Sequence, residues 1–410
     1  MSQRFHFVDG LRALCALFVV EHHIFYEIFE SKQWVLISQP VQLMSGWLRH
    51  GYISVAAFIV LSGFCLMLPV VANGSDSLAG GVKSFLLRRA RRILPPYYAA
   101  LGLCLLLLLL VPGFNRPSGF HWDWSVPGLT KNAIISHLLL IHNLNPTWIT
   151  KIDHPLWSIA IEWQIYFVFA LLLIPIRRKF GTVAAIACAC ALGAAPGLLF
   201  HTGDWTRPWY LGLFSVGMLS ATIACSPHST ATYLRGRIPW GLLTVSFGML
   251  EMYFAAAGFS QTTNEIATAI ALMCCLVWGC SFDTAKCTAL GRAAMSLLRE
   301  PRLVSIGIFS YSIYLIHAPI IALLRMALEL LTLAPTAIYG LLLLLGSILS
   351  VAIGYAFFLM VERPFLRSRI KSRATAGHAP LGVVRMRTVR GAMPVHPASV
   401  APRCGTEDNN

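Results

Sequence analysis

The sequence begins with a strongly apolar run, FVDGLRALCALFVVEHHIFYEIF, which extends from Phe7 to Phe29. A run of this length is sufficient to span a bilayer as a single helix. It nevertheless carries ionisable side chains, among them Arg12 and His23. Because ionisable groups are costly inside a membrane, they usually face the protein interior or a water-filled cavity and mark a functional site.

The spacing of Arg12 and His23 indicates how the two side chains lie on this helix. Eleven residues separate them, and eleven steps of about 100° return almost to the starting direction. At about 1.5 Å per residue, His23 lies roughly 16 Å from Arg12 along the same face. We therefore expect a fixed cation near one membrane surface and a titratable imidazole near the middle. The alternative is that Arg12 extends to lipid headgroups while His23 is a buried packing residue.

The composition indicates a polytopic membrane protein. Of 410 residues, 57% are hydrophobic and 12% are charged, whereas a soluble domain has about 25% charged residues. The net charge of +15 comes from Lys and Arg that cluster in loops and the tail, which is typical of cytoplasmic loops and argues against nucleic-acid binding. The cysteines lie mostly in apolar runs and lack metal-ligand spacing to histidines, so we expect neither a metal site nor a disulfide framework.

Hydropathy and charge together predict an all-α bundle of about ten transmembrane helices with both termini in the cytoplasm. In that topology, residues 112–155 form one long outer segment. We expect residues 1–365 to be a single membrane domain and residues 366–410 a basic, disordered cytoplasmic tail. In a bacterium the protein would lie in the inner membrane. The predicted spans are residues 11–30, 53–72, 93–111, 156–176, 182–200, 208–225, 239–258, 265–281, 306–329 and 337–361.

A basic strip, FLLRRARRILPPYY, precedes the third predicted span and extends from Phe85 to Tyr98. Arg89 and Arg92 share a helix face, as do Arg88 and Arg92. Guanidinium groups bind phosphate oxygens in a bidentate manner, so this face suits a polyphosphate ligand at the cytoplasmic surface. The alternative is a positive cluster that only fixes topology.

The fourth predicted span opens with Trp157, which can anchor the helix at the membrane interface. Ser158, Glu162 and Tyr166 follow on one face at four-residue intervals. A carboxylate inside a span needs a partner, and its own helix offers no cation. We therefore predict that Glu162 contacts His23 and raises the basicity of the imidazole by orienting it.

Two further stretches carry small or hydroxyl side chains. The Ser62-Gly63 pair in the second predicted span favours close approach of another helix, with a substrate contact as the alternative. In the ninth predicted span, Tyr311 and Tyr314 can line a polar passage, while His317 can equally be a structural hydrogen-bonding residue.

In this order, the motifs resemble the acyltransferase-3 family of integral membrane acyltransferases, which includes the O-antigen and Nod-factor O-acetylases. The resemblance covers residues 5–365. One departure is Trp163, where many members have a second acidic residue, which weakens any mechanism that needs paired carboxylates there. The stretches that carry the resemblance are Arg12-x10-His23, Phe58 to Phe64, Phe85 to Tyr97 with its arginines, Trp157-Ser158-x3-Glu162 and Ser310 to His317.

The resemblance implies transfer of an acyl group, usually acetyl from acetyl-CoA, to a hydroxyl of a carbohydrate, glycan or secondary metabolite, without a metal ion. His23 would act as general base, or would first accept the acyl group covalently. The implied site residues are His23 and Glu162 for catalysis, Arg12, Arg88, Arg89 and Arg92 for acyl-CoA, and Trp157, Ser158, Tyr311 and Tyr314 for substrate.

Two other functions fit parts of the pattern. A secondary transporter or flippase for a lipid-linked or anionic solute would explain the spans and the intramembrane charge. The absence of an internal sequence repeat and the presence of Arg12 and His23 on one helix argue against it. A non-catalytic acyl-CoA sensor would have less reason to retain His23 together with the arginine strip.

Overall fold

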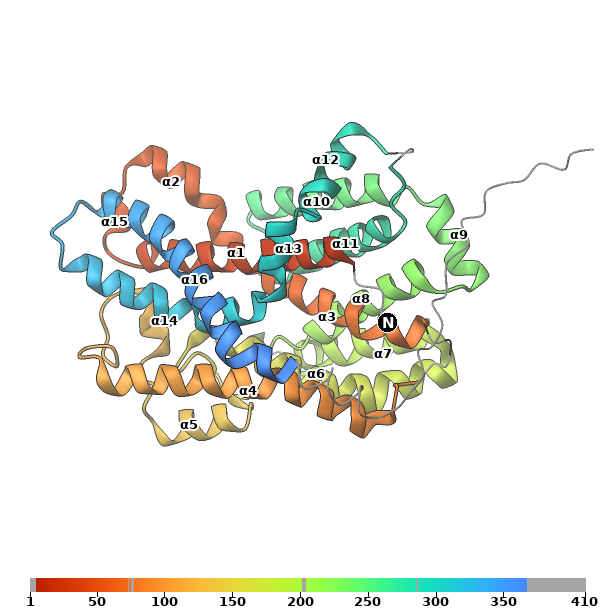
Figure 1. Ribbon diagram of the computed structural model, residues 1–410, viewed down its shortest axis with the longest axis horizontal. Helices are drawn as coiled ribbons and strands as arrows, with labels where there is room; N and C mark the ends of the chain where they lie inside the picture. Colours follow the sequence, from red (N-terminus) through yellow and green to blue (C-terminus); the bar gives the residue numbers. More distant parts are fainter. Residues whose placement is uncertain (1–4, 73, 75–76, 201–203, 285–286, 367–410) are drawn as a thin grey trace, which may run out of the picture.

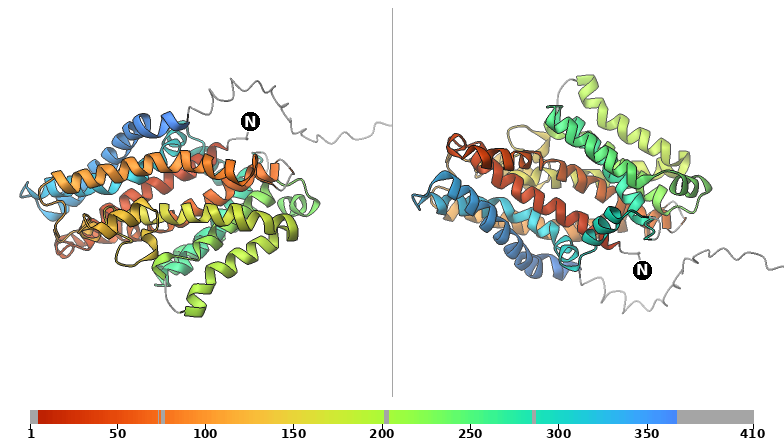
Figure 2. Two further views of the ribbon diagram at one scale, coloured as in Figure 1. Left: turned by 90° about the horizontal axis from the view of Figure 1, so that it is seen from below. Right: turned by 90° about the horizontal axis from the view of Figure 1, so that it is seen from above.

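The computed structural model describes residues 5–72, 74, 77–200, 204–284 and 287–366. Every regular element in these ranges is helical, and the long helices run roughly parallel along the long axis of the bundle (Figures 1 and 2). The all-α prediction is thus confirmed. Apart from residue 366, the predicted tail lies outside the described residues.

The helices alternate between long spans and short connecting segments. Their bounds are α1 His6–Phe29, α2 Gln39–Ser45, α3 Ile53–Ala72, α4 Gly81–Leu110, α5 Lys131–Leu138, α6 Trp157–Val168, α7 Ile174–Phe200, α8 Tyr210–Cys225, α9 Ser229–Arg237, α10 Trp240–Ala256, α11 Gln261–Cys280, α12 Ala289–Leu298, α13 Pro301–Ile308, α14 Ser310–Glu329, α15 Pro335–Leu341 and α16 Ser347–Phe357. Two short 3-10 helices that matter for the site are η3 His121–Ser125 and η5 His154–Leu156.

The chain is an integral, multi-pass membrane protein. Seven helical segments of the described chain are long and apolar enough to cross a membrane, or up to eight if α9 and α10, bent by 70°, form one span. The predicted ten spans differ from this number for physical reasons. α1 carries four charged residues, and the continuous segment His154–Leu199 contains two predicted spans. These two lie on either side of Gly181, whose φ of 89° breaks the helix. The count of ten and the cytoplasmic termini stay predictions.

α1 lies within the bundle, where it contacts α3, α13 and α14 (Figure 1). Half of its residues are buried, including Phe7, Val19 and Ile24. Burial by protein on several sides explains how a helix with Arg12 and His23 fits within a membrane protein, because these side chains face other helices rather than lipid.

α3 and α8 cross at very short distance, as the Ser62-Gly63 pair predicts. A Cβ atom on Gly63 would lie 2.0 Å from the backbone oxygen of Phe214. In return, a Cβ atom on Gly217 of α8 would lie 2.0 Å from the backbone oxygen of Val60. Glycine on both helices therefore permits backbone-to-backbone contact, which stabilises helix pairs in membranes.

We expect Gly63→Val to destabilise the protein strongly, because the added side chain meets backbone atoms that cannot rotate away. The free energy of unfolding should fall by about 3 kcal/mol. The thermal unfolding midpoint of purified protein in detergent measures this loss. The matched control is Gly248→Val in α10, where an added Cβ meets nothing within 4 Å. Equal midpoints for the two variants would contradict the close crossing.

The segment between α4 and α6 caps one end of the bundle. Its one α-helix, α5, has eight residues and is too short to cross a bilayer, which agrees with the expectation that residues 112–155 form one segment without a span. α5 lies toward the same end as α2 and α15 (Figure 1). Within this segment η3 contacts both α1 and α14, and η5 contacts α14. The cap therefore places its own side chains against the inner helices.

Candidate active site

Four histidines from distant parts of the chain meet where the cap covers α1. They are His23 on α1, His121 in η3, His154 in η5 and His317 on α14. Nδ1 of His23 lies 3.3 Å from Nε2 of His121 and 3.1 Å from Nε2 of His154. The ring centres of His23 and His317 are 4.9 Å apart. His23 is half-buried, whereas the other three are buried.

The contact of Glu30 with His121 favours one tautomer of His23. Nδ1 of His121 lies 2.8 Å from Oε2 of Glu30, and a carboxylate only accepts, so this nitrogen carries the proton. In its neutral form, His121 therefore presents an unprotonated Nε2 to His23. A hydrogen bond between these two rings places the proton of His23 on Nδ1 and leaves the lone pair on its Nε2. Glu30, His121 and His23 form one chain that ends in a nitrogen base.

The cap and α14 hold the remaining two imidazoles. The backbone N–H of His154 donates to Oγ of Ser125 at 3.1 Å, and the same oxygen lies 3.0 Å from Nδ1 of the ring. Nδ1 of His317 donates to the backbone oxygen of Tyr314 at 2.8 Å. Beside His154, burial raises the pKa of Asp153 to about 7. The ring positions are thus set by backbone and hydroxyl contacts.

The predicted contact between Glu162 and His23 is absent from the hydrogen bonds of the described residues. Glu162 instead accepts a hydrogen bond from the Tyr166 hydroxyl at 2.6 Å and lines a cavity together with Arg12. The helix rise explains the difference: Arg12 and Glu162 share one level, and His23 lies eleven residues, or roughly 16 Å, farther along α1. His121, rather than the predicted Glu162, occupies the position next to His23.

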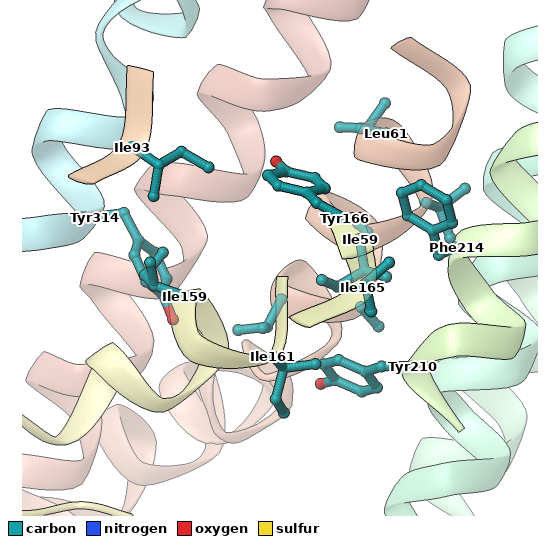
Figure 3. Packing of buried hydrophobic residues seen from close by; sticks show 14 of the residues in the cluster. Ile59, Leu61, Ile93, Ile159, Ile161, Ile165, Tyr166, Tyr210, Phe214 and Tyr314 are labelled. Carbon is teal, nitrogen blue, oxygen red and sulfur yellow. The ribbon is translucent and has the colours of Figure 1, made fainter. Parts of the chain in front are cut away.

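The second polar centre is a narrow cavity of about 50 Å³ around Arg12. Among the described residues, Nε of Arg12 is buried without a hydrogen-bond partner. Tyr166 lies between Ile93 and Leu61 (Figure 3), and all three contribute to the wall. The full lining is Arg12, Leu61, Ser62, Cys65, Leu66, Arg89, Arg92, Ile93, Glu162, Tyr166 and Tyr311.

The structure separates the predicted donor-binding arginines. Arg89 and Arg92, three residues apart on α4, line the cavity with Arg12. Arg88 instead donates from Nη2 to the backbone oxygen of Ala79 at 2.8 Å and is not among the lining residues. Of the three strip arginines predicted to bind the donor, two thus converge with Arg12 in space, as the helix face shared by Arg89 and Arg92 indicated.

The four predicted substrate residues occupy three places. The Tyr311 hydroxyl donates to the backbone oxygen of Ile93 at the arginine cavity. The hydroxyls of Ser158 and Tyr314 are 2.7 Å apart and buried, next to the histidines. The ring of Trp157 lies 4.7 Å from the guanidinium carbon of Arg207, a cation–π contact.

Sequence reasoning missed Glu30, His121 and His154. His121 and His154 are 98 and 131 residues from His23. No short sequence motif identifies either residue as a neighbour of His23. The signal available in the sequence is that His154 lies three residues before Trp157. His22 borders the cluster, with its ring centre 5.3 Å from that of His23, but its Nδ1 faces the backbone oxygen of Leu48 at 2.9 Å.

Comparison with known proteins shows the family of the chain. A family described as an acyltransferase domain matches residues 5–359. The acyltransferase MdmB of Streptomyces mycarofaciens is 27% identical over 336 residues, covering 77% of this chain and 78% of that protein.

Two further relatives carry O-acetyltransferase in their names. A candidate O-acetyltransferase of Staphylococcus aureus (strain COL) is 24% identical, covering 77% of this chain and half of that protein. The peptidoglycan O-acetyltransferase OatA of Listeria monocytogenes is 24% identical, covering 41% of this chain and 24% of that protein. No solved structure matches. With a family match over nearly its whole length, the chain belongs to the acyltransferase-3 family of membrane acyltransferases and is an O-acyltransferase.

Proposed function

We propose that the protein transfers an acyl group, in the first place acetyl, from cytoplasmic acyl-CoA to a hydroxyl of a carbohydrate, glycan or secondary metabolite. The observation that carries this proposal is the chain from Glu30 through His121 to His23. It gives a half-buried imidazole a defined tautomer and an available Nε2, which are the requirements for a general base.

In the proposed reaction, Nε2 of His23 takes the proton of the acceptor hydroxyl while the oxygen attacks the thioester carbonyl. The tetrahedral intermediate expels the thiolate of coenzyme A, which takes the proton back from His23. The positive charge that develops on His23 is stabilised through His121 by the carboxylate of Glu30, as in other carboxylate–imidazole relays. A covalent acyl-His23 intermediate is the alternative route.

The arginine cavity supports a donor site on the same protein. Arg12, Arg89 and Arg92 are cations suited to the phosphates of coenzyme A, and Arg88 lies on the same stretch of α4, outside the cavity lining. Glu162 lies at this cavity, and we propose that it acts there by positioning Tyr166 and the neighbouring cations.

The acceptor is proposed at the level of chemical class. One relative is named a peptidoglycan O-acetyltransferase, which supports a glycan hydroxyl. A hydroxyl of a secondary metabolite is the other class that the family resemblance implies. Ser158, Tyr314, Tyr311 and Trp157 are proposed to contact substrate or to support the groups that do.

The deciding experiment compares glycan and metabolite profiles by mass spectrometry in cells with and without the protein. We expect one class of molecule to lose an acetyl group when the protein is absent. Purified protein with radiolabelled acetyl-CoA should transfer label to that molecule, and a rapid quench without acceptor shows whether label first joins the protein. Identical profiles and no transfer by the purified protein would overturn the proposal and favour a transporter.

A further inference from the structure

We propose that His23, His121 and His154 form a binding site for a divalent transition-metal ion of the zinc class, such as Zn²⁺ or Co²⁺. One nitrogen from each ring faces a common point, and these three atoms all lie within 4.8 Å of one another. Two of the separations are 3.1 and 3.3 Å. Tetrahedral zinc with Zn–N bonds of 2.0–2.1 Å requires neighbouring nitrogens about 3.3 Å apart.

Proton counting favours a cation at this point. Nε2 of His121 carries a lone pair, because its Nδ1 proton is used on Glu30. Nδ1 of His23 faces this nitrogen and also Nε2 of His154. One proton on His23 cannot make two linear hydrogen bonds, so at least one pair is poorly satisfied. A metal ion accepts a lone pair from each of the three nitrogens at once.

The surroundings supply what metal-binding histidines usually have. Glu30 accepts the Nδ1 proton of His121, which gives the carboxylate–histidine arrangement that orients a ligating ring and raises its basicity. Ser125 holds the ring of His154 from its far side. Glu27 lies one helical turn beyond His23. Among the described residues its buried Oε2 has no hydrogen-bond partner, so a carboxyl oxygen is available beside the cluster.

A fourth position remains for a small molecule, because the three nitrogens within 4.8 Å of one another belong to His23, His121 and His154. His317 lies beside this group, with its ring centre 4.9 Å from that of His23. Nε2 of His317 is buried and has no partner within the described part of the chain, while its Nδ1 is held by Tyr314. Imidazole ligands select zinc-class ions over calcium and magnesium, which prefer oxygen. Because His23 is half-buried, an ion can reach the site.

Metal binding also affects the base role of His23, a consequence that rests on the proposed function. A metal ion on Nδ1 requires Nε2 to keep the proton of the neutral ring. His23 then has no lone pair for the acceptor hydroxyl. His23 therefore cannot hold the metal ion and act as the base at the same time, so the ion inhibits acyl transfer.

The test uses full-length protein purified through an affinity tag that contains no histidine. After treatment with EDTA, the protein is dialysed against Zn²⁺ and its metal content is measured by mass spectrometry. We expect one Zn²⁺ per chain. Glu30→Gln should weaken binding by about 10–100-fold, and His121→Ala or His154→Ala should weaken it further. The matched control is His228→Ala, an exposed histidine outside the cluster.

Cobalt binding to the unaltered protein provides a readout that does not depend on how the variants fold. Co²⁺ in a site with three nitrogen ligands and an open fourth position should give intense visible absorption bands. Weak octahedral bands, or Zn²⁺ content unchanged in His121→Ala together with His154→Ala, would overturn the site.

Activity separates the site from the proposed function. Saturating Zn²⁺ should abolish acyl transfer, and EDTA should restore it. One bound Zn²⁺ with full activity would overturn the mutual exclusion. Absence of transfer under every condition, with the Zn²⁺ site intact, would count against the proposed function alone.

Discussion

His23→Ala is expected to abolish acyl transfer while leaving the protein folded. A positioned general base contributes about 10²–10⁴-fold to rate, so kcat should fall at least a thousandfold when both the base and its relay to Glu30 are lost. The fold should persist, because α1 is held mainly by buried apolar residues such as Phe7 and Ile24. His23→Gln, which keeps the volume but not the base, should be equally inactive.

The matched control for this prediction is His22→Ala. His22 is the neighbouring imidazole, but its Nδ1 faces the backbone of Leu48 and it takes no part in the relay. Initial rates with radiolabelled acetyl-CoA and the identified acceptor measure both variants at equal amounts of folded protein. More than a tenth of normal kcat in His23→Ala would remove this residue from the chemistry.

Arg89→Ala and Arg92→Ala should each raise KM for acetyl-CoA with little change in kcat. A hydrogen bond to a charged group is worth about 1.5–3 kcal/mol, which corresponds to roughly 10–100-fold in binding. Both side chains line the Arg12 cavity. Added salt should raise KM of the unaltered protein for the same reason, because it screens the attraction between phosphates and guanidinium groups.

Arg91→Ala is the control for the arginine strip. Arg91 is exposed, lies between the two tested residues and is not among the lining residues of the cavity. Its loss removes the same charge from the same helix. If all three variants raised KM equally, the effect would be general surface electrostatics rather than a donor site.

Local patterns in the sequence were sufficient to predict much of the fold and the convergence of Arg89 and Arg92 at the arginine cavity. Apolar length indicated the spanning helices, the Ser62-Gly63 pair indicated a close helix contact, and the face shared by Arg89 and Arg92 indicated a common target. Each of these depends on residues within one helix, where the 3.6-residue period fixes relative direction. The gap between the fourth and fifth predicted spans likewise coincides with Gly181, where a φ of 89° breaks the helix.

The histidine cluster depends on chain folding that no local period encodes. His121 and His154 come from the segment between α4 and α6, and only the way η3 and η5 fold against α1 and α14 brings them to His23. The predicted contact between Glu162 and His23 was wrong for a related reason. Apolar length tells how far a residue lies within its own helix, but the relative shift of two helices along the membrane normal comes from their packing. The expected absence of a metal site rested on sequence spacing, which does not detect ligands from separate segments.

The separation of Arg12 and His23 along α1 has a consequence for traffic between compartments. In the proposed function, the donor binds at one end of the helix and the base lies near the other, so neither the coenzyme nor the acceptor would have to cross the bilayer. Only the acyl group would change sides, in the manner of a group translocation. Cells would then keep their coenzyme A pool inside, and an outer compartment without any activated donor could still be acylated.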